Sequence, residues 1–237
     1  MYRILQRHGE VRERRDQLRH PKYTKPELVA TGPNQVWSWD ITKLKGPVKL
    51  CYYNLYVILD IYSRYVVGWM VADRESSQLA QTLIKTTADR QGIDPNQLTL
   101  HSDRGPSMTS VGVAELLARL EITRSLNRPY CSNDNPYSES QFKTLKYQPT
   151  FPDRFGSQQD ARSFCGEFFE WYNQHHYHTR MALLTPYSIH YGLAEGVLEQ
   201  RQLVLDDAYQ RMPRRFAQRP YAGSLPEAVW INKPNQD

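Results

Sequence analysis

Asp40 is the first of three acidic residues whose position predicts chemistry. Apolar and polar residues alternate over residues 36–42, which predicts a β-strand with Asp40 on its polar face. Asp is disfavoured inside strands, and a buried carboxylate costs free energy unless it is paired or holds a metal ion. Asp40 is therefore a candidate metal ligand. An edge strand that leaves Asp40 in solvent is the alternative interpretation.

Asp103 is the second acid, and it follows the end of a short predicted strand at residues 98–101. Gly105 and a predicted helix come after it. Open α/β sheets bind ligands outside the carboxyl ends of their strands, which is where Asp103 is expected. An ordinary turn or helix-capping role is the alternative for this residue.

Glu139 is the third acid and lies one turn into a predicted helix. We expect Asn135 to cap this helix and Pro136 to occupy its first position. Lys143 and Lys146 follow Glu139 at four and seven residues, so they share its helical face. Taken alone, this pattern also fits a solvated Glu/Lys surface.

Carboxylates on two strands and a helix together predict a site for hard cations. Mg²⁺ takes oxygen ligands and keeps several positions open for water and phosphate. Two such ions, about 3.5–4 Å apart, clamp the attacking and leaving oxygens of an in-line phosphoryl displacement. The three acids therefore favour phosphodiester chemistry.

The elements that must position these acids predict an α/β fold. Strongly apolar strands are expected at residues 52–61 and 65–72, and short turns join them to the first strand in an antiparallel meander. A helix that begins at Ser76 or Ser77 and ends at Gly92 follows. The strand at 98–101, a second helix and a strand at 122–126 then require parallel crossovers. The expected result is a mixed five-stranded sheet flanked by helices.

Two helices are predicted downstream of Glu139. The first begins near Ser157 and carries an apolar stripe at helical spacing, formed by Ala161, Phe164, Cys165, Phe168, Phe169 and Tyr172. Thr185 and Pro186 open the next helix by the cap-then-proline rule. The C-terminal part is expected to be a helical extension.

Composition restricts the classes of protein that fit. Lys and Arg outnumber Asp and Glu by 30 to 25, and residues 1–30 hold eight basic against four acidic residues. The three cysteines, Cys51, Cys131 and Cys165, are isolated, which argues against a disulfide scaffold or a thiolate zinc site. No apolar stretch approaches the roughly 20 residues needed to cross a bilayer. We expect no membrane partner and a cytoplasmic location.

Several motifs resemble those of bacterial insertion-sequence transposases with a retroviral-integrase-like catalytic core. The resemblance rests on Trp39-Asp40-Ile41-Thr42, Leu59-Asp60-Ile61-Tyr62-Ser63-Arg64 with Val67-Gly68-Trp69, His101-Ser102-Asp103-Arg104-Gly105, Asn133 to Ser140, Phe142 to Lys146, Trp171-Tyr172-Asn173 and Leu184-Thr185-Pro186. Between Asp103 and Glu139 lie 35 residues, the spacing typical of this branch. The similarity runs from about residue 34 to residue 192.

The resemblance implies a ribonuclease H-like fold in which Asp40, Asp103 and Glu139 are catalytic and bind two Mg²⁺ or Mn²⁺ ions per site. It implies a polynucleotidyl transferase that cuts DNA at transposon ends and joins the freed 3′-hydroxyl to a target phosphodiester. The expected partners are transposon-end and target DNA, with a homo-oligomer assembled on them. The expected location is the bacterial cytoplasm, at the nucleoid when DNA is bound.

Residues around the acids have expected roles in binding and positioning. Lys143 and Lys146 are the predicted DNA-backbone contacts, followed by Arg104 and Arg128. His101 precedes Asp103 by two residues, so it is expected to orient the site, to shuttle protons or simply to pack beside it. Asn135 is expected beside the carboxylates as well.

Two further groups of polar residues invite interpretation. Asp60 is expected to anchor a turn through contact with Arg64, in preference to acting as a fourth metal ligand. His175, His176 and His178 follow an apolar helix without a nearby cysteine or a suitably spaced acid. Phosphate contact or solvation is therefore favoured over a zinc site.

The expected organisation is a basic N-terminal arm at 1–33, an integrase-like core at 34–192 and an extension at 193–237. Residues 1–9 resemble the tail of the helix-turn-helix module that precedes the core in such transposases. Either the start lies inside a longer reading frame, or the element is truncated or split over two frames. A plain nuclease on the same fold and an inactive remnant that only binds DNA are the alternative functions.

Overall fold

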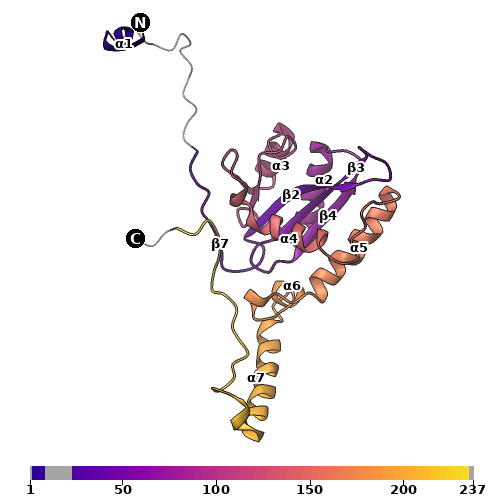
Figure 1. Cartoon of the computed structure of the whole chain (residues 1–237), viewed down its shortest axis with the longest axis vertical. Coiled ribbons are helices and arrows are strands. Elements are labelled where there is room, and N and C mark those ends of the chain that lie inside the picture. The colour runs from indigo at the N-terminus through magenta and orange to yellow at the C-terminus, as the bar shows by residue number, and fades with distance from the viewer. Residues whose placement is uncertain (1, 9–22, 235–237) are drawn as a thin grey trace.

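The computed structural model describes residues 2–8 and 23–234 of the chain, and its centre is a five-stranded mixed sheet (Figure 1). The strands are β2 (Val36–Lys45), β3 (Tyr52–Asp60), β4 (Val66–Ala72), β5 (Thr99–Ser102) and β6 (Thr123–Leu126). Their order across the sheet is β4-β3-β2-β5-β6. Strand β2 is therefore central, and the edge-strand interpretation of Asp40 is wrong.

The topology follows from the lengths of the connections. Short turns join β2, β3 and β4 into an antiparallel meander, as the sequence predicts. Helices α2 (Ser77–Gln91) and α3 (Val111–Arg119) provide the crossovers, so β5 pairs with β2 and β6 pairs with β5 in parallel. The predicted mixed sheet is confirmed.

Helices cover both faces of the sheet, which gives the fold two hydrophobic layers. On one face Trp37, Trp39 and Tyr56 pack in a cluster with side chains of α2 and α3. On the other face Leu55 and Val57 pack with α4 (Pro136–Lys146) and α5 (Gln158–Gln174). On the polar face predicted for residues 36–42, Ser38 is buried, and Asp40 and Thr42 are half-buried.

The predicted helix ends follow local hydrogen-bonding rules. Ser76 caps α2 by accepting from the backbone N–H of Gln78, and Gly92 ends the helix in the left-handed region at φ 61°. Ser157 caps α5 in the same way. The predicted apolar stripe of α5 is confirmed, since all of its members are buried except Phe164, which is half-buried. Thr185 caps the short α6 (Pro186–His190).

The last part of the chain returns to the first. Helix α7 (Ala194–Arg211) projects away from the sheet, and the chain then runs back to β7 (Val229–Ile231), as Figure 1 shows. Strand β7 pairs antiparallel with β1 (Leu28–Ala30). No sequence pattern predicts this pairing, because it joins segments almost the whole chain apart.

The remaining elements are short. They are α1 (Tyr2–Arg7) and the 3-10 helices η1 (Ser132–Asp134), η2 (Thr179–Met181) and η3 (Pro213–Arg215). Most of the basic side chains of the expected N-terminal arm, from Arg12 to Lys22, lie outside the described residues. No helix in the described part of the chain combines the length and the apolar character that crossing a lipid bilayer requires.

Gly68 permits the close packing of β4 on α2, which gives a first prediction. A Cβ at this position would lie 2.2 Å from Thr87 Oγ1 and 3.1 Å from its Cγ2. We therefore expect Gly68→Ala to lower the free energy of unfolding by about 1–3 kcal/mol in urea denaturation. In the double variant with Thr87→Ala the two effects should be clearly less than additive.

Gly196 in α7 provides the matched control, because a Cβ there meets no atom within 4 Å. Gly196→Ala should leave stability unchanged or raise it by up to about 1 kcal/mol. Strict additivity of the Gly68 and Thr87 substitutions would show that the contact between them is not the cause.

Candidate active site

The end of strand β5 brings Asp40 and Asp103 together. Strand β5 pairs with β2 only as far as Ser102, which lies opposite Trp39. Asp40 is the next residue of β2 and Asp103 the first residue after β5, so the two aspartates stand beside each other where the parallel pairing stops. Asp40 thus keeps its strand partner on β3 and loses the one on β5, and its carboxylate borders open space.

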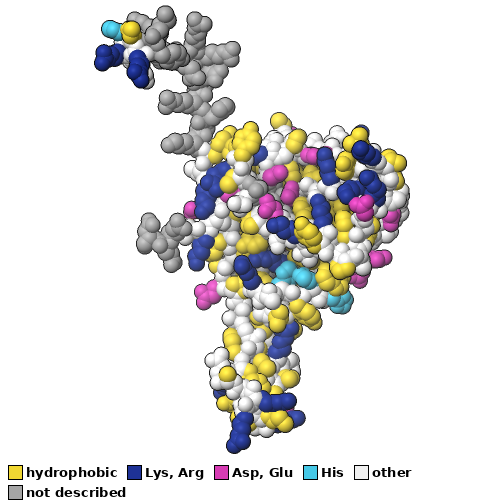
Figure 2. Space-filling model, in the orientation of Figure 1, with side chains coloured by type: hydrophobic (Ala, Val, Ile, Leu, Met, Phe, Trp, Pro, Cys, Tyr) yellow, Lys and Arg dark blue, Asp and Glu magenta, His cyan; other side chains and the backbone are white. Residues whose placement is uncertain are grey.

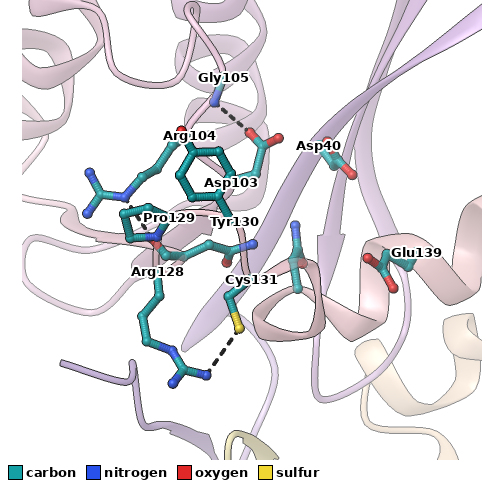
Figure 3. A pocket seen from close by; sticks show the side chains of 11 residues that line it. Asp40, Asp103, Arg104, Gly105, Arg128, Pro129, Tyr130, Cys131 and Glu139 are labelled. Atoms are coloured by element: carbon teal, nitrogen blue, oxygen red, sulfur yellow. Dashed lines mark hydrogen bonds between the residues drawn. The ribbon is translucent and has the colours of Figure 1, made fainter. Parts of the chain in front are cut away.

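Glu139, in the first turn of α4, completes this group of acids. Figure 3 shows the side chains of Asp40, Asp103 and Glu139 around one hollow. The hollow measures about 770 Å³, and its remaining lining comes from Arg104, Gly105, Asn127, Arg128, Pro129, Tyr130, Cys131 and Asn135. The structure therefore brings all three sequence-predicted acids to one place, from two strands and a helix.

The hollow carries negative charge that the chain neutralises only partly. Burial raises the pKa of Asp40 to about 7, with further contributions from the charges of Asp103 and Glu139. A hydrogen bond from the backbone N–H of Ile41 at 2.7 Å and the charge of Lys146 oppose this rise. The site therefore favours a bound cation.

Asp103 is held by its own loop. Its Oδ1 accepts from the backbone N–H of Gly105 at 2.9 Å. A Cβ on Gly105 would lie 2.6 Å from Met108 Sδ and 3.2 Å from Asp103 Oδ1. A side chain at residue 105 would thus crowd the carboxylate, which explains the glycine two residues after Asp103.

The carboxylates converge without meeting at one point. Within the described residues, no three Asp, Glu, His or Cys side chains lie close enough together to hold a single ion. The fit to metal therefore rests on two observations: oxygen-only acidic side chains around an open hollow, and the raised pKa of Asp40 among its neighbours.

Asn135 corrects one sequence prediction. It occupies the N-cap position of α4, but its side chain makes no capping hydrogen bond. Its amide oxygen accepts from Ser38 Oγ, and its Nδ2 donates to the backbone oxygen of Trp39 at 3.3 Å. The amide thus ties the start of α4 to β2 beside Asp40. The capping rule failed because it is local, whereas Ser38 is a buried partner 97 residues away.

His101 supports the loop before α4. Its side chain is fully buried, and its ring nitrogens lie 2.9 Å from Ser125 Oγ and 2.8 Å from the backbone oxygen of Asp134. Burial lowers its pKa, which keeps the ring neutral. Both nitrogens are engaged away from the carboxylates, which favours the packing interpretation over a proton shuttle.

Two of the predicted DNA contacts, Lys143 and Lys146, are exposed on α4. Lys146 Nζ donates to Thr42 Oγ1 at 2.6 Å. The guanidinium of Arg104 lies 4.4 Å from the centre of the Tyr23 ring, and its Nε donates to the backbone oxygen of Asn127 at 2.7 Å. Of these side chains, Lys146 acts on Asp40 through its charge, and Arg104 lines the hollow.

Arg128, the fourth predicted contact, lines the hollow and forms an ion pair with the buried Asp134. Its Nε and NH2 donate to the two carboxylate oxygens of Asp134, each at 3.0 Å. The sequence analysis did not predict that Asp134 is buried and pairs with Arg128. The signal was present, because Asp134 lies inside the Asn133–Ser140 motif, but its partner could not be read from spacing.

The remaining polar candidates have structural roles. The fully buried carboxylate of Asp60 accepts from Ser63 and from the backbone N–H of Asn34, whereas the Arg64 guanidinium donates to the backbone oxygen of Ile61 and stacks on Tyr137. The predicted turn anchored by an Asp60–Arg64 contact is confirmed, since the backbone N–H of Arg64 donates to the backbone oxygen of Asp60 at 2.9 Å.

The histidines after α5 differ from one another. His178 packs against the rings of His176 and Tyr172, and burial lowers its pKa to about 4. The solvated interpretation is therefore wrong for His178. His175 is exposed, as expected.

The raised pKa of Asp40 gives a second prediction. The folded protein holds this proton more tightly than the unfolded chain, so its free energy of unfolding falls as pH rises from about 4 to about 7. In EDTA at pH 8 we expect Asp40→Asn to raise Tm by the order of 5 °C, since 1 kcal/mol corresponds to roughly 2–4 °C at this size. The gain should shrink at pH 5.

The exposed Asp73 supplies the matched control, and Asp73→Asn should leave Tm unchanged at both pH values. A Tm for Asp40→Asn that is equal to or below that of the unsubstituted chain at pH 8 would contradict the electrostatic account.

Comparison with known proteins identifies the family. Residues 30–132 and residues 120–186 each match a model described as "Integrase core domain". The transposase InsF for insertion sequence IS3A of Escherichia coli (strain K12) is 31% identical over 161 residues, which cover 68% of this chain and 55% of that protein. The transposase for insertion sequence element IS904 of Lactococcus lactis subsp. lactis (strain IL1403) is 28% identical over 170 residues, 71% of this chain and 66% of that protein.

The similarity is limited to part of these relatives and extends to a solved structure. The match to the E. coli relative spans about half of that protein's length, 55%. In the solved structures, a chain of the simian T-cell lymphotropic virus intasome in complex with PP2A regulatory subunit B56 gamma has the same fold. It superimposes with a TM-score of 0.54 at 22% identity, covering 74% of this chain and 60% of that one. With two matched segments that together span residues 30–186, the chain carries an integrase core with a ribonuclease H-like fold, and it is similar to insertion-sequence transposases.

Proposed function

We propose that this chain is the catalytic part of an insertion-sequence transposase. It would cut DNA at the ends of the element and join the freed 3′-hydroxyl to a target phosphodiester. The observation that carries the proposal is the position of Asp40, Asp103 and Glu139 around one hollow of an integrase core. The similarity to two insertion-sequence transposases supports it.

The acids would hold two divalent ions, Mg²⁺ or Mn²⁺. They line one open hollow from two strands and a helix, so water and phosphate oxygens can complete the coordination of the ions. In this proposal Asp40 and Asp103 contribute to both ions and Glu139 completes the second. When bound, such ions stabilise the attacking and leaving oxygens of an in-line displacement.

The protein's own residues would position the DNA for this reaction. The backbone of β2 fixes the position of Asp40, and the loop that follows β5 fixes that of Asp103.

In strand transfer the 3′-oxygen attacks a target phosphorus, its proton goes to solvent, and the bond to the target's own 3′-oxygen breaks. The number of phosphodiester bonds is unchanged, so no nucleotide cofactor is required.

Basic side chains near the acids would hold the DNA backbone. Lys143 and Lys146 extend α4 beyond Glu139, and Arg104 and Arg128 line the hollow. Figure 2 shows Lys and Arg side chains spread over the visible face of the core, with acidic side chains between them. Because an element has two ends to be cut and joined, we also propose that at least two copies act together on DNA.

Strand transfer by the intact chain is the direct test. With labelled duplex ends from the flanks of the reading frame and Mn²⁺ or Mg²⁺, joined products should form and should be absent in EDTA. Glu139→Gln keeps the size of the side chain and removes its charge, so joining should fall at least about 100-fold. Glu167→Gln, an exposed position on α5, is the matched control and should retain full activity.

The outcomes separate the alternative functions. Metal-dependent cutting without joining would favour a plain nuclease and contradict the transferase. DNA binding with no metal-dependent turnover would indicate an inactive remnant. Equal activity of Glu139→Gln and Glu167→Gln would contradict the proposed catalytic role of Glu139.

Phosphate contact by Lys143 predicts a salt effect. Each phosphate contact releases counterions, so Lys143→Ala should weaken binding of unrelated duplexes alike and reduce the slope of log Kd against log salt by about 1. Lys85→Ala, exposed on α2 on the other face of the sheet, should leave the slope unchanged. Identical slopes for both variants would contradict a Lys143 contact.

A further inference from the structure

Asp134 connects the loop before α4 to the C-terminal part of the chain through hydrogen bonds with Arg128 and Asn232. Its side chain is fully buried, and its two carboxylate oxygens together receive four hydrogen bonds. Three come from the backbone and guanidinium of Arg128, all at 3.0 Å, and the fourth comes from Nδ2 of Asn232 at 2.9 Å. These bonds hold the pKa of Asp134 well below its usual range, so it remains charged.

Asn232 is itself fixed, which makes it a firm anchor. It follows β7 directly and adopts φ 56°, a left-handed conformation that Asn tolerates better than most residues. Its Nδ2 also donates to the backbone oxygen of Pro26, at 3.0 Å, just before β1. Val229 and Ile231 of β7 are buried in a hydrophobic cluster that also contains Ala30 of β1 and Ile189 of α6.

Strand β7 contacts the glutamate helix at a second point. The backbone oxygen of Trp230 accepts from the Tyr137 hydroxyl at 2.7 Å. Tyr137 precedes Glu139 by two residues in the first turn of α4. The C-terminal strand therefore holds both the loop before α4, through Asp134, and the first turn of α4, through Tyr137.

We infer that Asn232 is a positioning residue for Glu139 and that β7 acts as a clamp on the start of α4. This inference rests on the proposed function, in which Glu139 completes the second metal ion. Nothing in the motifs around the three acids includes Asn232, which lies 98 residues from Asp134 in the sequence.

The path from the clamp to Glu139 is short and runs through directly bonded residues. His101 holds the backbone oxygen of Asp134 from the strand β5 side, at 2.8 Å. The next residue, Asn135, bonds to Ser38 and Trp39 of β2, and its backbone oxygen accepts from the N–H of Glu139. A shift at Asp134 is therefore transmitted to both β2 and the glutamate. Displacement of a catalytic group by about 1 Å can cost on the order of 100-fold in rate.

Asn232→Gly removes the side-chain contacts to Asp134 and Pro26 without backbone strain, because glycine adopts φ 56° readily. The matched control is Asn96→Gly: Asn96 has φ 61° and donates its Nδ2 to the carboxylate of Glu121 at 2.7 Å, on the surface. Tyr137→Phe is a second variant that removes only the hydroxyl contact to β7. All three are made in the full chain.

Two measurements decide the inference, and neither requires turnover. Amide hydrogen exchange over residues 127–140 should be about tenfold faster in Asn232→Gly, because a tenfold change corresponds to about 1.4 kcal/mol, near the contribution of a hydrogen bond to a charged group. The Mn²⁺ concentration for half-maximal rise in Tm should increase about three- to tenfold. Tyr137→Phe should shift both quantities in the same direction, and Asn96→Gly should shift neither.

Faster exchange confined to residues 28–30 and 229–231, with an unchanged Mn²⁺ requirement, would overturn the inference, because the strand pair would then stabilise only itself. If the unsubstituted chain shows no response to Mn²⁺, the proposed metal function fails. The exchange over residues 127–140 then decides the clamp alone, since it reports the position of the loop without metal.

Discussion

The structure depends on where strand β5 stops. A carboxylate in the centre of a sheet has no place between two hydrogen-bonded neighbours that are covered by helices. Because β5 ends at Ser102, β2 continues for six residues beyond the parallel pairing, and Asp40 is the first of them. The same interruption exposes Asp103 at the carboxyl end of its strand. Because β5 ends there, Asp40 and Asp103 lie side by side and the hollow next to them stays open.

Placing the carboxylate of Asp40 near those of Asp103 and Glu139 costs electrostatic free energy. Asp40 lies near two other carboxylates, and only Lys146 among the causes of its pKa shift opposes them with a positive charge. Other buried charges are treated differently: Asp134 is matched by Arg128, and Asp60 receives hydrogen bonds from Ser63 and Asn34. The contrast separates acids that hold the fold together from acids left available to a cation.

Contacts with several distant segments hold the start of helix α4, which carries Glu139. Its start is fixed by buried polar contacts from several directions: β2 through Asn135, β5 through His101, and β7 through Tyr137 and Asn232. Such networks are costly when incomplete, since each lost partner leaves a buried polar group unsatisfied. The precision of Glu139 therefore depends on segments distributed over most of the chain.

The sequence by itself determined the kinds of element and the identity of the three acids. Alternation revealed β2, and apolar runs with short turns revealed the rest of the meander. The stripe of α5 matched its buried face, and helix ends were marked by Ser76, Gly92, Ser157 and Thr185. These signals act between residues a few positions apart. Only the tertiary structure decided which polar groups meet. Asn135 bonds to Ser38 instead of capping its helix, Asp134 joins Asn232, and β1 pairs with β7. Such partners lie about 100 to 200 residues apart, and a contact between distant residues leaves no periodic trace in either segment.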